Sequence, residues 1–255
     1  MLNLLLLDQK YIAYTLDIKR YLLKFLFSRK PFPLQIGEAV FMIEPRSSDL
    51  FTIYEIFFDR GYLPKLPKFP KIVDTVVDLG ANIGVFSVWA SSVFRPKAVV
   101  AVEMEPACYN QLVENIALNH LEDTVRPFQG AIFSHSGAVG TRKIPGSNFY
   151  EVAPQKSTHR VKSFSFKDFL NMTHLDRVDL LKIDIEGAEK YLLTEENASL
   201  FKRCVRYILL ETHSLNDFKS EQAAAYLGSL GFRLALTRTP YKWDRNYIID
   251  ACNPF

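Results

Sequence analysis

Cysteine and histidine are both scarce in this chain of 255 residues. Its three cysteines, Cys108, Cys204 and Cys252, form an odd set without a CxxC pair. This argues against a disulfide framework and against a thiolate zinc site, and it favours a reducing cytoplasm. The five histidines show no HxxxH or HExxH spacing, which would place two ligands on one face of a helix. We therefore expect no metal site.

Long hydrophobic runs are also missing. The leucine-rich residues 1–7 are followed by Asp8, so the run is far shorter than the roughly 20 residues that span a bilayer. No basic segment precedes it, which argues against a signal peptide. Apolar residues then recur at helical spacing among basic ones, which predicts an amphipathic N-terminal helix within residues 1–35. Residues 1–30 would pack on the domain, contact a second subunit, or rest on an anionic membrane surface.

The charge of the chain is close to balanced. A formal net charge of +3 and a pI near 8.6 are too mild to indicate a nucleic-acid partner, because such proteins concentrate basic side chains on one face. With 48% hydrophobic residues, the chain can bury the core of one large domain, which we place at residues 36–255.

After residue 70, short β-branched runs alternate with longer amphipathic stretches. This pattern predicts a parallel sheet covered by helices. We expect strands at 73–79, 98–103, 124–128, 178–184 and 205–211, helices at 83–93, 107–119 and 221–230, and a closing hairpin from 232–237 and 247–251. Upstream we expect a strand at 39–43 and a helix at 49–58. The irregular residues 131–164 are expected to form a hairpin or flap over a ligand.

A glycine loop, Asp78-Leu79-Gly80-Ala81-Asn82-Ile83-Gly84, follows the first predicted strand and opens a helix. Gly80 and Gly84 permit a tight turn and close backbone approach, and the helix N-terminus favours an anionic group. A dinucleotide site needs G-x-G-x-x-G, but Ala81 and Asn82 occupy the place of the second glycine. Asp78 suits either the ammonium of a methionine moiety or bracing of the loop. The loop thus favours S-adenosylmethionine over a dinucleotide.

Glu103 ends the second predicted strand, about 20 residues after the loop, where an acid accepts hydrogen bonds from ribose hydroxyls. We expect the adenine beside Met104 and the Gly130-Ala131 turn, where small residues leave room for a flat base. The alternatives are that Glu103 and Glu105 are surface acids and that Gly130 only forms a turn. Together with the loop, these residues complete the predicted cofactor site.

Acidic residues also follow the fourth and fifth predicted strands. The segment after the fourth holds Asp184, Glu186 and Glu189, and the fifth ends in Glu211-Thr212-His213. An open α/β sheet places its ligand crevice at these strand ends, where idle charge is costly. We expect Asp184, Glu186 and His213 to be catalytic, because a carboxylate or imidazole that takes a hydroxyl proton contributes roughly 10²–10⁴-fold. Glu189 and Glu211 would face the substrate. The alternatives are that the acids after the fourth strand only cap a helix and that His213 is a structural histidine.

Three blocks carry a family resemblance: residues 77–84, the D-x-E-G-x-E core within 182–189, and Leu210-Glu211-Thr212-His213. With the upstream Ser48-Asp49-Leu50, they make residues 46–250 resemble the FkbM-type methyltransferases. The resemblance implies a class I methyltransferase fold, with a seven-stranded sheet whose last strand is antiparallel and helices on both faces. It also implies S-adenosylmethionine as cofactor and a hydroxyl acceptor on a sugar, glycan or small metabolite. Asp49, which lies in the upstream segment, joins the substrate candidates.

Other functions stay open. N-methyltransferases of nucleic acids or proteins commonly carry an Asn/Asp-Pro-Pro-Tyr/Phe turn after the fourth strand, where this chain has Asp184-Ile185-Glu186-Gly187. A nicotinamide oxidoreductase and a cofactor-binding protein without activity are further alternatives. We expect an O-methyltransferase of the cytoplasm or of the membrane periphery.

Overall fold

The computed structural model describes residues 28–45, 47–58, 62–66, 69–143, 150–152, 157, 159–213, 218–238 and 247–253. Its central sheet has seven strands in the order β12-β13-β11-β10-β3-β4-β5. Their bounds are β3 (Thr75–Leu79), β4 (Ala98–Glu103), β5 (Val125–Gln129), β10 (Leu180–Ile183), β11 (Tyr207–Thr212), β12 (Arg233–Arg238) and β13 (Tyr247–Cys252). β13 is antiparallel to both of its neighbours, whereas β5, β4, β3, β10 and β11 are parallel. The predicted class I methyltransferase fold is confirmed.

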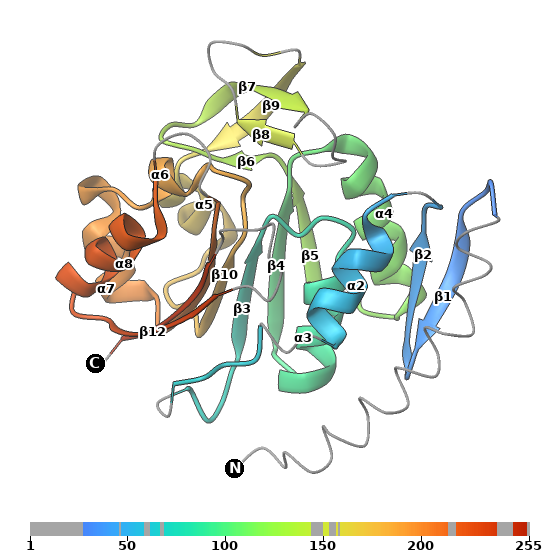
Figure 1. Cartoon of the computed structure of the whole chain (residues 1–255), viewed down its shortest axis with the longest axis horizontal. Helices are drawn as coiled ribbons and strands as arrows, with labels where there is room; N and C mark the ends of the chain where they lie inside the picture. The colour runs from blue at the N-terminus through green and yellow to red at the C-terminus, as the bar shows by residue number, and fades with distance from the viewer. Residues whose placement is uncertain are drawn as a thin grey trace.

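Helices cover both faces of this sheet (Figure 1). One face carries α2 (Asp49–Phe57), α3 (Val85–Phe94) and α4 (Pro106–Leu118), and the other carries α5 (Phe166–Thr173), α7 (Ala198–Cys204) and α8 (Ser220–Ser229). Successive strand residues alternate between the two cores, so that Val76 packs on the first helix layer and Val77 on the second. Both valines are fully buried, which stabilises the fold by about 1.5–3 kcal/mol per side chain.

The N-terminal boundary differs from the prediction. A hairpin of β1 (Phe32–Ile36) and β2 (Ala39–Ile43) begins inside the segment that we assigned to the helix. Alternate β1 side chains are buried, the pattern of a strand with one face on a core. Asn115 of α4 accepts the amide proton of Met42, and Asn119, the residue after α4, accepts that of Val40. These two bonds hold the hairpin to the domain. Residues 1–27 lie outside the described residues, so the amphipathic helix remains a prediction there.

The predicted flap is a four-stranded sheet in the order β6-β9-β7-β8. Its strands are β6 (Ala131–Ile132), β7 (Gly137–Lys143), β8 (Tyr150–Val152) and β9 (His159–Phe164), and it lies beyond the end of the central sheet (Figure 1). Sequence analysis assigned no element to α5, to α7 or to the short α6 (Glu189–Leu192). Within the described ranges, every helix is too short or too polar to span a bilayer.

Candidate active site

The glycine turn connects β3 to α3 with left-handed backbone, φ being +79° at Gly80, +50° at Asn82 and +88° at Gly84. A Cβ on Gly80 would lie 1.7 Å from the carbonyl oxygen of Asp184, and one on Gly84 would lie 2.6 Å from Leu112 Cδ1. The sequence analysis attributed both glycines to a tight turn, which these φ angles show, and to close approach of the backbone to a ligand. The structure gives another reason, because the neighbouring β10 and α4 chains occupy the space of a side chain.

A pocket opens beside this turn, with about 670 Å³ of empty space that includes open solvent at its mouth. Six of the nine predicted cofactor residues line it, namely Gly80, Asn82, Glu103, Met104, Gly130 and Ala131. Its walls are completed by Val102, Glu105, Cys108, Ile132, Val152, Asp184, Ile185, Glu186 and Ala188. Val152 belongs to β8 of the four-stranded flap sheet, so the flap contributes to the pocket wall. This agrees with the expectation that residues 131–164 lie over a ligand. Asp78, Ala81 and Gly84 are not among the lining residues.

Glu103 is buried at the pocket wall. Its carboxylate accepts the amide protons of Asn82 (2.8 Å) and Glu105 (2.7 Å), and burial raises its pKa to about 7. Glu105, the second candidate for the ribose acid, instead caps α4 by accepting the amide proton of Cys108 at 2.7 Å. These contacts favour Glu103 as the acid that meets a ribose.

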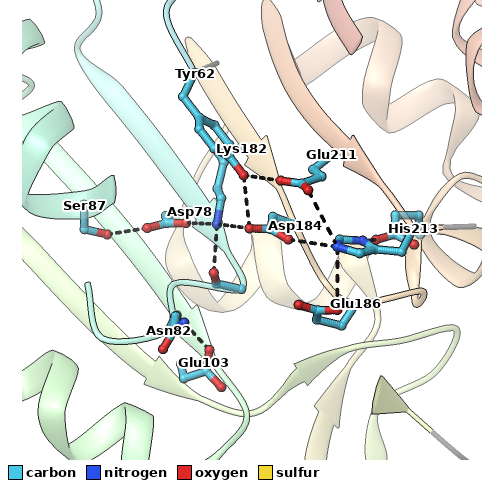
Figure 2. Close-up of polar contacts among 12 residues, drawn as sticks. Tyr62, Asp78, Asn82, Ser87, Glu103, Lys182, Asp184, Glu186, Glu211 and His213 are labelled. Atoms are coloured by element: carbon cyan, nitrogen blue, oxygen red, sulfur yellow. Dashed lines mark hydrogen bonds and ion pairs between the residues drawn. The ribbon is translucent and has the colours of Figure 1, made fainter. Parts of the chain in front are cut away.

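Asp78 is fully buried and does not reach the pocket. Its Oδ2 accepts from the Ser87 hydroxyl at 2.7 Å, and its Oδ1 lies 3.2 Å from Lys182 Nζ (Figure 2). Of the two interpretations of Asp78, these contacts match the brace of the loop, and the partner of a cofactor ammonium stays a prediction. Ser87 lies on α3 and Lys182 on β10, so this carboxylate ties the turn to both elements.

Lys182 connects the glycine turn to the acids after β10. Its Nζ donates to the Gly80 carbonyl at 2.8 Å and lies 3.2 Å from Oδ2 of Asp184. Burial alone would lower the pKa of Lys182, but the carboxylates of Asp184 and Asp78 outweigh it and raise that pKa above its ordinary value. Sequence analysis gave Lys182 no role, although a lysine inside an apolar strand was a signal.

His213 stands at the centre of the acids that follow β10 and β11 (Figure 2). Its Nδ1 lies 3.0 Å from Glu189 Oε1, and its Nε2 lies 3.6 Å from Asp184 Oδ1 and from Glu186 Oε2. Glu211 Oε1 is 4.0 Å from the same Nε2. The fold thus brings together the predicted catalytic residues, because β10 and β11 are parallel neighbours.

The charges in this group shift the pKa values of the three predicted catalytic residues, and these shifts bear on which of them can accept a proton. Burial would lower the pKa of His213, but Glu186 and Glu189 raise it well above the usual value. A raised pKa favours the protonated imidazole, which argues against His213 as the general base. Burial raises the pKa of Glu186 to about 7, whereas Lys182 and His213 overcome burial and lower the pKa of Asp184.

Tyr62 is the functional candidate that sequence analysis missed, because it stands in the proline-rich stretch between α2 and β3, outside every predicted element. The side chain is 1% exposed, and its hydroxyl lies 2.5 Å from Glu211 Oε2 and 3.2 Å from Asp184 Oδ2, both of which accept from it. Burial and these carboxylates raise the pKa of Tyr62 well above its ordinary value, so it remains a donor. Tyr62 therefore fixes the positions of two acids.

The three substrate candidates do not line the described pocket. Asp49 begins α2, where its carboxylate accepts from the Glu44 amide at 2.8 Å and from Gln111 Nε2 at 2.7 Å. These bonds connect the start of α2 to the end of β2 and to α4, which is a structural role. Glu189 is fully buried and accepts from His213 and from the Gly187 amide. Glu211 is held by Tyr62. Glu189 and Glu211 thus contact the catalytic candidates rather than the pocket itself.

Comparison with known proteins identifies the family. The model of the methyltransferase FkbM domain matches residues 78–234. The chain is an FkbM methyltransferase. Methyltransferase sdnD of Sordaria araneosa is 29% identical, with 79% of this chain and 88% of the relative covered. Methyltransferase 1 of Beauveria bassiana is 25% identical, with 74% and 82% covered.

A solved structure shares the fold of this FkbM methyltransferase. Methyltransferase FkbM from Methylobacillus flagellatus KT superposes with a TM-score of 0.54 at 15% identity, covering 77% of this chain. The chain spans 47% of that protein's length. Family membership confirms the expectation of a methyltransferase that uses S-adenosylmethionine.

The pocket of this FkbM methyltransferase fits a sulfonium nucleoside. Glu103 presents a carboxylate for ribose hydroxyls, while Val102, Ile132 and Val152 supply an apolar wall for a flat base. A Cβ on Gly130 would lie 2.7 Å from Phe164 Cε2 and 2.9 Å from the Lys162 carbonyl, so only glycine fits the close turn after β5. The donor set therefore agrees with the cofactor of the family.

Proposed function

We propose that this FkbM methyltransferase methylates a hydroxyl oxygen of a sugar, glycan or small metabolite. The observation that carries the proposal is the pair of pocket-lining carboxylates, Asp184 and Glu186, beside His213. Carboxylates accept hydrogen bonds from hydroxyl groups and accept the proton that leaves during transfer. The acceptor oxygen bonds to the methyl carbon as the carbon–sulfur bond breaks, and the electron pair of that bond stays on sulfur.

The charge of this region supports a hydroxyl acceptor over nucleic acid. Four carboxylates surround His213, and a phosphate backbone would be repelled by them. The same acids would attract a cationic amine, so amine methylation is the second candidate. Because transfer needs the acceptor held in line with the methyl carbon, positioning contributes up to about 7–11 kcal/mol in favourable cases.

The test is a transfer assay with methyl-labelled S-adenosylmethionine over hydroxylated metabolites, sugars, glycans and matched amines. Nuclear magnetic resonance of the product distinguishes an O-methyl from an N-methyl group. Calorimetry with S-adenosylmethionine and with NAD accompanies the assay. Transfer only to amines would replace the hydroxyl proposal by the second candidate, whereas binding of NAD alone would overturn both.

Glu186→Gln separates acceptor chemistry from cofactor binding. The substitution keeps the shape of a side chain that lines the pocket but removes its charge, so we expect kcat to fall by roughly 10²–10⁴-fold. The Kd of S-adenosylmethionine, measured by calorimetry, should stay within a few-fold. The control is Glu122→Gln at an exposed acid, which should change neither value. Equal losses in kcat and cofactor affinity would assign Glu186 to the cofactor instead.

Glu103 predicts that cofactor affinity depends on pH. Its pKa of about 7 means that the carboxyl is largely neutral at pH 6 and ionised at pH 8. An ionised acceptor makes the stronger hydrogen bonds to ribose hydroxyls, so affinity should rise across this interval. Glu103→Gln should weaken binding at pH 8 by about 10-fold or more and flatten the profile. A profile that is the same in both proteins would remove Glu103 from the ribose site.

A further inference from the structure

The His213 cluster has the spacing of a cation site. One donor atom each from Asp184, Glu186 and His213 lie within 4.8 Å of one another. The Nε2 of His213 is 3.6 Å from both acids, longer than the roughly 2.7–3.2 Å of hydrogen bonds. Ligands held about 2.0–2.4 Å from one ion are separated by about 2.8–3.4 Å at right angles, about 3.3–3.9 Å at the tetrahedral angle and about 4.0–4.8 Å across the ion. The separations in this cluster suit a shared ion.

The histidine is oriented as in metal sites. Glu189 Oε1 also accepts the Gly187 amide proton at 3.2 Å, so it is an acceptor for a proton on Nδ1 of His213. That leaves Nε2 aimed between Asp184 and Glu186, without a hydrogen bond to any described residue (Figure 2). The residue is 8% exposed. A carboxylate behind the far ring nitrogen is the arrangement that fixes the ring orientation of metal-binding histidines.

The charge balance points the same way. In the connected network of described residues, Lys182 is a cation, and His213 carries a positive charge only when it is protonated. These two side chains face the carboxylates of Asp78, Asp184, Glu186 and Glu189. Burying surplus charge of one sign is unfavourable unless a counter-charge joins it. A divalent ion at the centre of the cluster would supply this counter-charge.

We propose that Asp184, Glu186 and His213 bind a divalent metal ion, with Asp184 Oδ1, Glu186 Oε2 and His213 Nε2 as ligands. The ion takes the place of a proton on Nε2, which is released to water when the ion binds. Carboxylates with one imidazole suit Mn²⁺ or a similar first-row ion. Asp184 and Glu186 line the pocket, so the remaining coordination positions face the acceptor. An acceptor with two neighbouring oxygens, such as a vicinal diol or a hydroxy acid, would chelate the ion.

This site deepens the proposed function and depends on it for the acceptor, though not for ion binding. A bound ion lowers the pKa of a coordinated hydroxyl, so that its proton leaves to water before or during methyl transfer. Glu186 then serves as a ligand rather than as the proton acceptor. The sequence contains no metal-ligand spacing because the three residues come from the ends of two strands, 29 positions apart at most.

The test is titration of the whole chain with Mn²⁺, without cofactor or acceptor, followed by electron paramagnetic resonance. We expect about one bound ion per chain and a nitrogen coupling from the imidazole in the pulsed spectrum. Glu186→Gln and His213→Gln should each weaken binding by about 10-fold or more, and His213→Gln should remove the nitrogen coupling. Glu122→Gln is the matched control and should bind as the wild type does.

Several outcomes would overturn the site. The first is no binding at millimolar Mn²⁺, and the second is binding that both variants leave unchanged. The third is a wild-type spectrum without nitrogen coupling, a measurement that does not depend on whether a variant folds. Calorimetry with S-adenosylmethionine on the same sample keeps the two proposals apart. Cofactor binding without Mn²⁺ binding rejects the metal site and leaves the methyltransferase proposal standing, whereas the reverse result rejects the cofactor assignment alone.

Discussion

Gly80→Ala should abolish detectable binding of S-adenosylmethionine and destabilise the fold by several kcal/mol. The new Cβ would lie 1.7 Å from the Asp184 carbonyl oxygen, a backbone atom of the residue that follows β10. The amide of Asp184 donates to the Leu79 carbonyl of β3 at 3.1 Å, which limits how far this backbone can move. Overpacking costs about 1–3 kcal/mol or more, and the positive φ adds about 1–2 kcal/mol. Displacement of the turn would also move the Gly80 carbonyl away from Lys182 Nζ. Calorimetry for the cofactor and urea unfolding measure both effects.

Gly231→Ala is the matched control for backbone strain. Its φ of +92° resembles that of Gly80, but a Cβ there would meet no atom within 4 Å. This variant should lose only the cost of the left-handed conformation, about 1–2 kcal/mol, and keep its cofactor affinity. If the two variants were equally stable and bound the cofactor alike, the close contact between the turn and β10 would not be what requires glycine at position 80.

The parts of the site that sequence analysis found are those encoded locally. The glycine loop starts at the end of β3, and Glu103 ends β4; both strands are recognisable from their valine-rich sequences. The spacing between the loop and Glu103 is that of one βαβ unit. Six lining residues were found in this way. The partners of Asp78 were not found, because Ser87 and Lys182 lie 9 and 104 positions away in the sequence. Such a pairing depends on strand order, which no local pattern contains.

The acceptor side shows the same limit more strongly. Asp184 and Glu211 were expected in one crevice because parallel strands end at the same edge, and Tyr62 hydrogen bonds to both. Tyr62 itself lies in the proline-rich stretch between α2 and β3, where no local pattern indicated a functional residue. The proton affinity of His213 depends on how many carboxylates surround it, so its ordinary pKa was a poor guide to its role. These are properties of assembled geometry.

Lys182→Met should cost about 3–5 kcal/mol of folding free energy, because it removes the buried cation between two carboxylates. Lys182 is 3% exposed, and its Nζ lies 3.2 Å from both Asp78 and Asp184. Methionine fills similar volume but removes the cation beside Asp78, leaves Asp184 with His213 alone, and leaves the Gly80 carbonyl without the Lys182 donor. We therefore also expect weaker cofactor binding. Urea unfolding and calorimetry measure the two losses.

Lys97→Met tests whether burial, and not pairing alone, sets this cost. Lys97 Nζ lies 3.1 Å from Asp74 Oδ2, nearly the same separation, but the two side chains are 80% and 43% exposed. Water already screens such a pair, so its loss should cost about 0–1 kcal/mol. Similar losses in both variants would mean that Asp78 and Asp184 find another counter-charge. Because these two carboxylates belong to the glycine turn and the acidic cluster, a large loss confined to Lys182 would identify it as the electrostatic link between cofactor site and acceptor site.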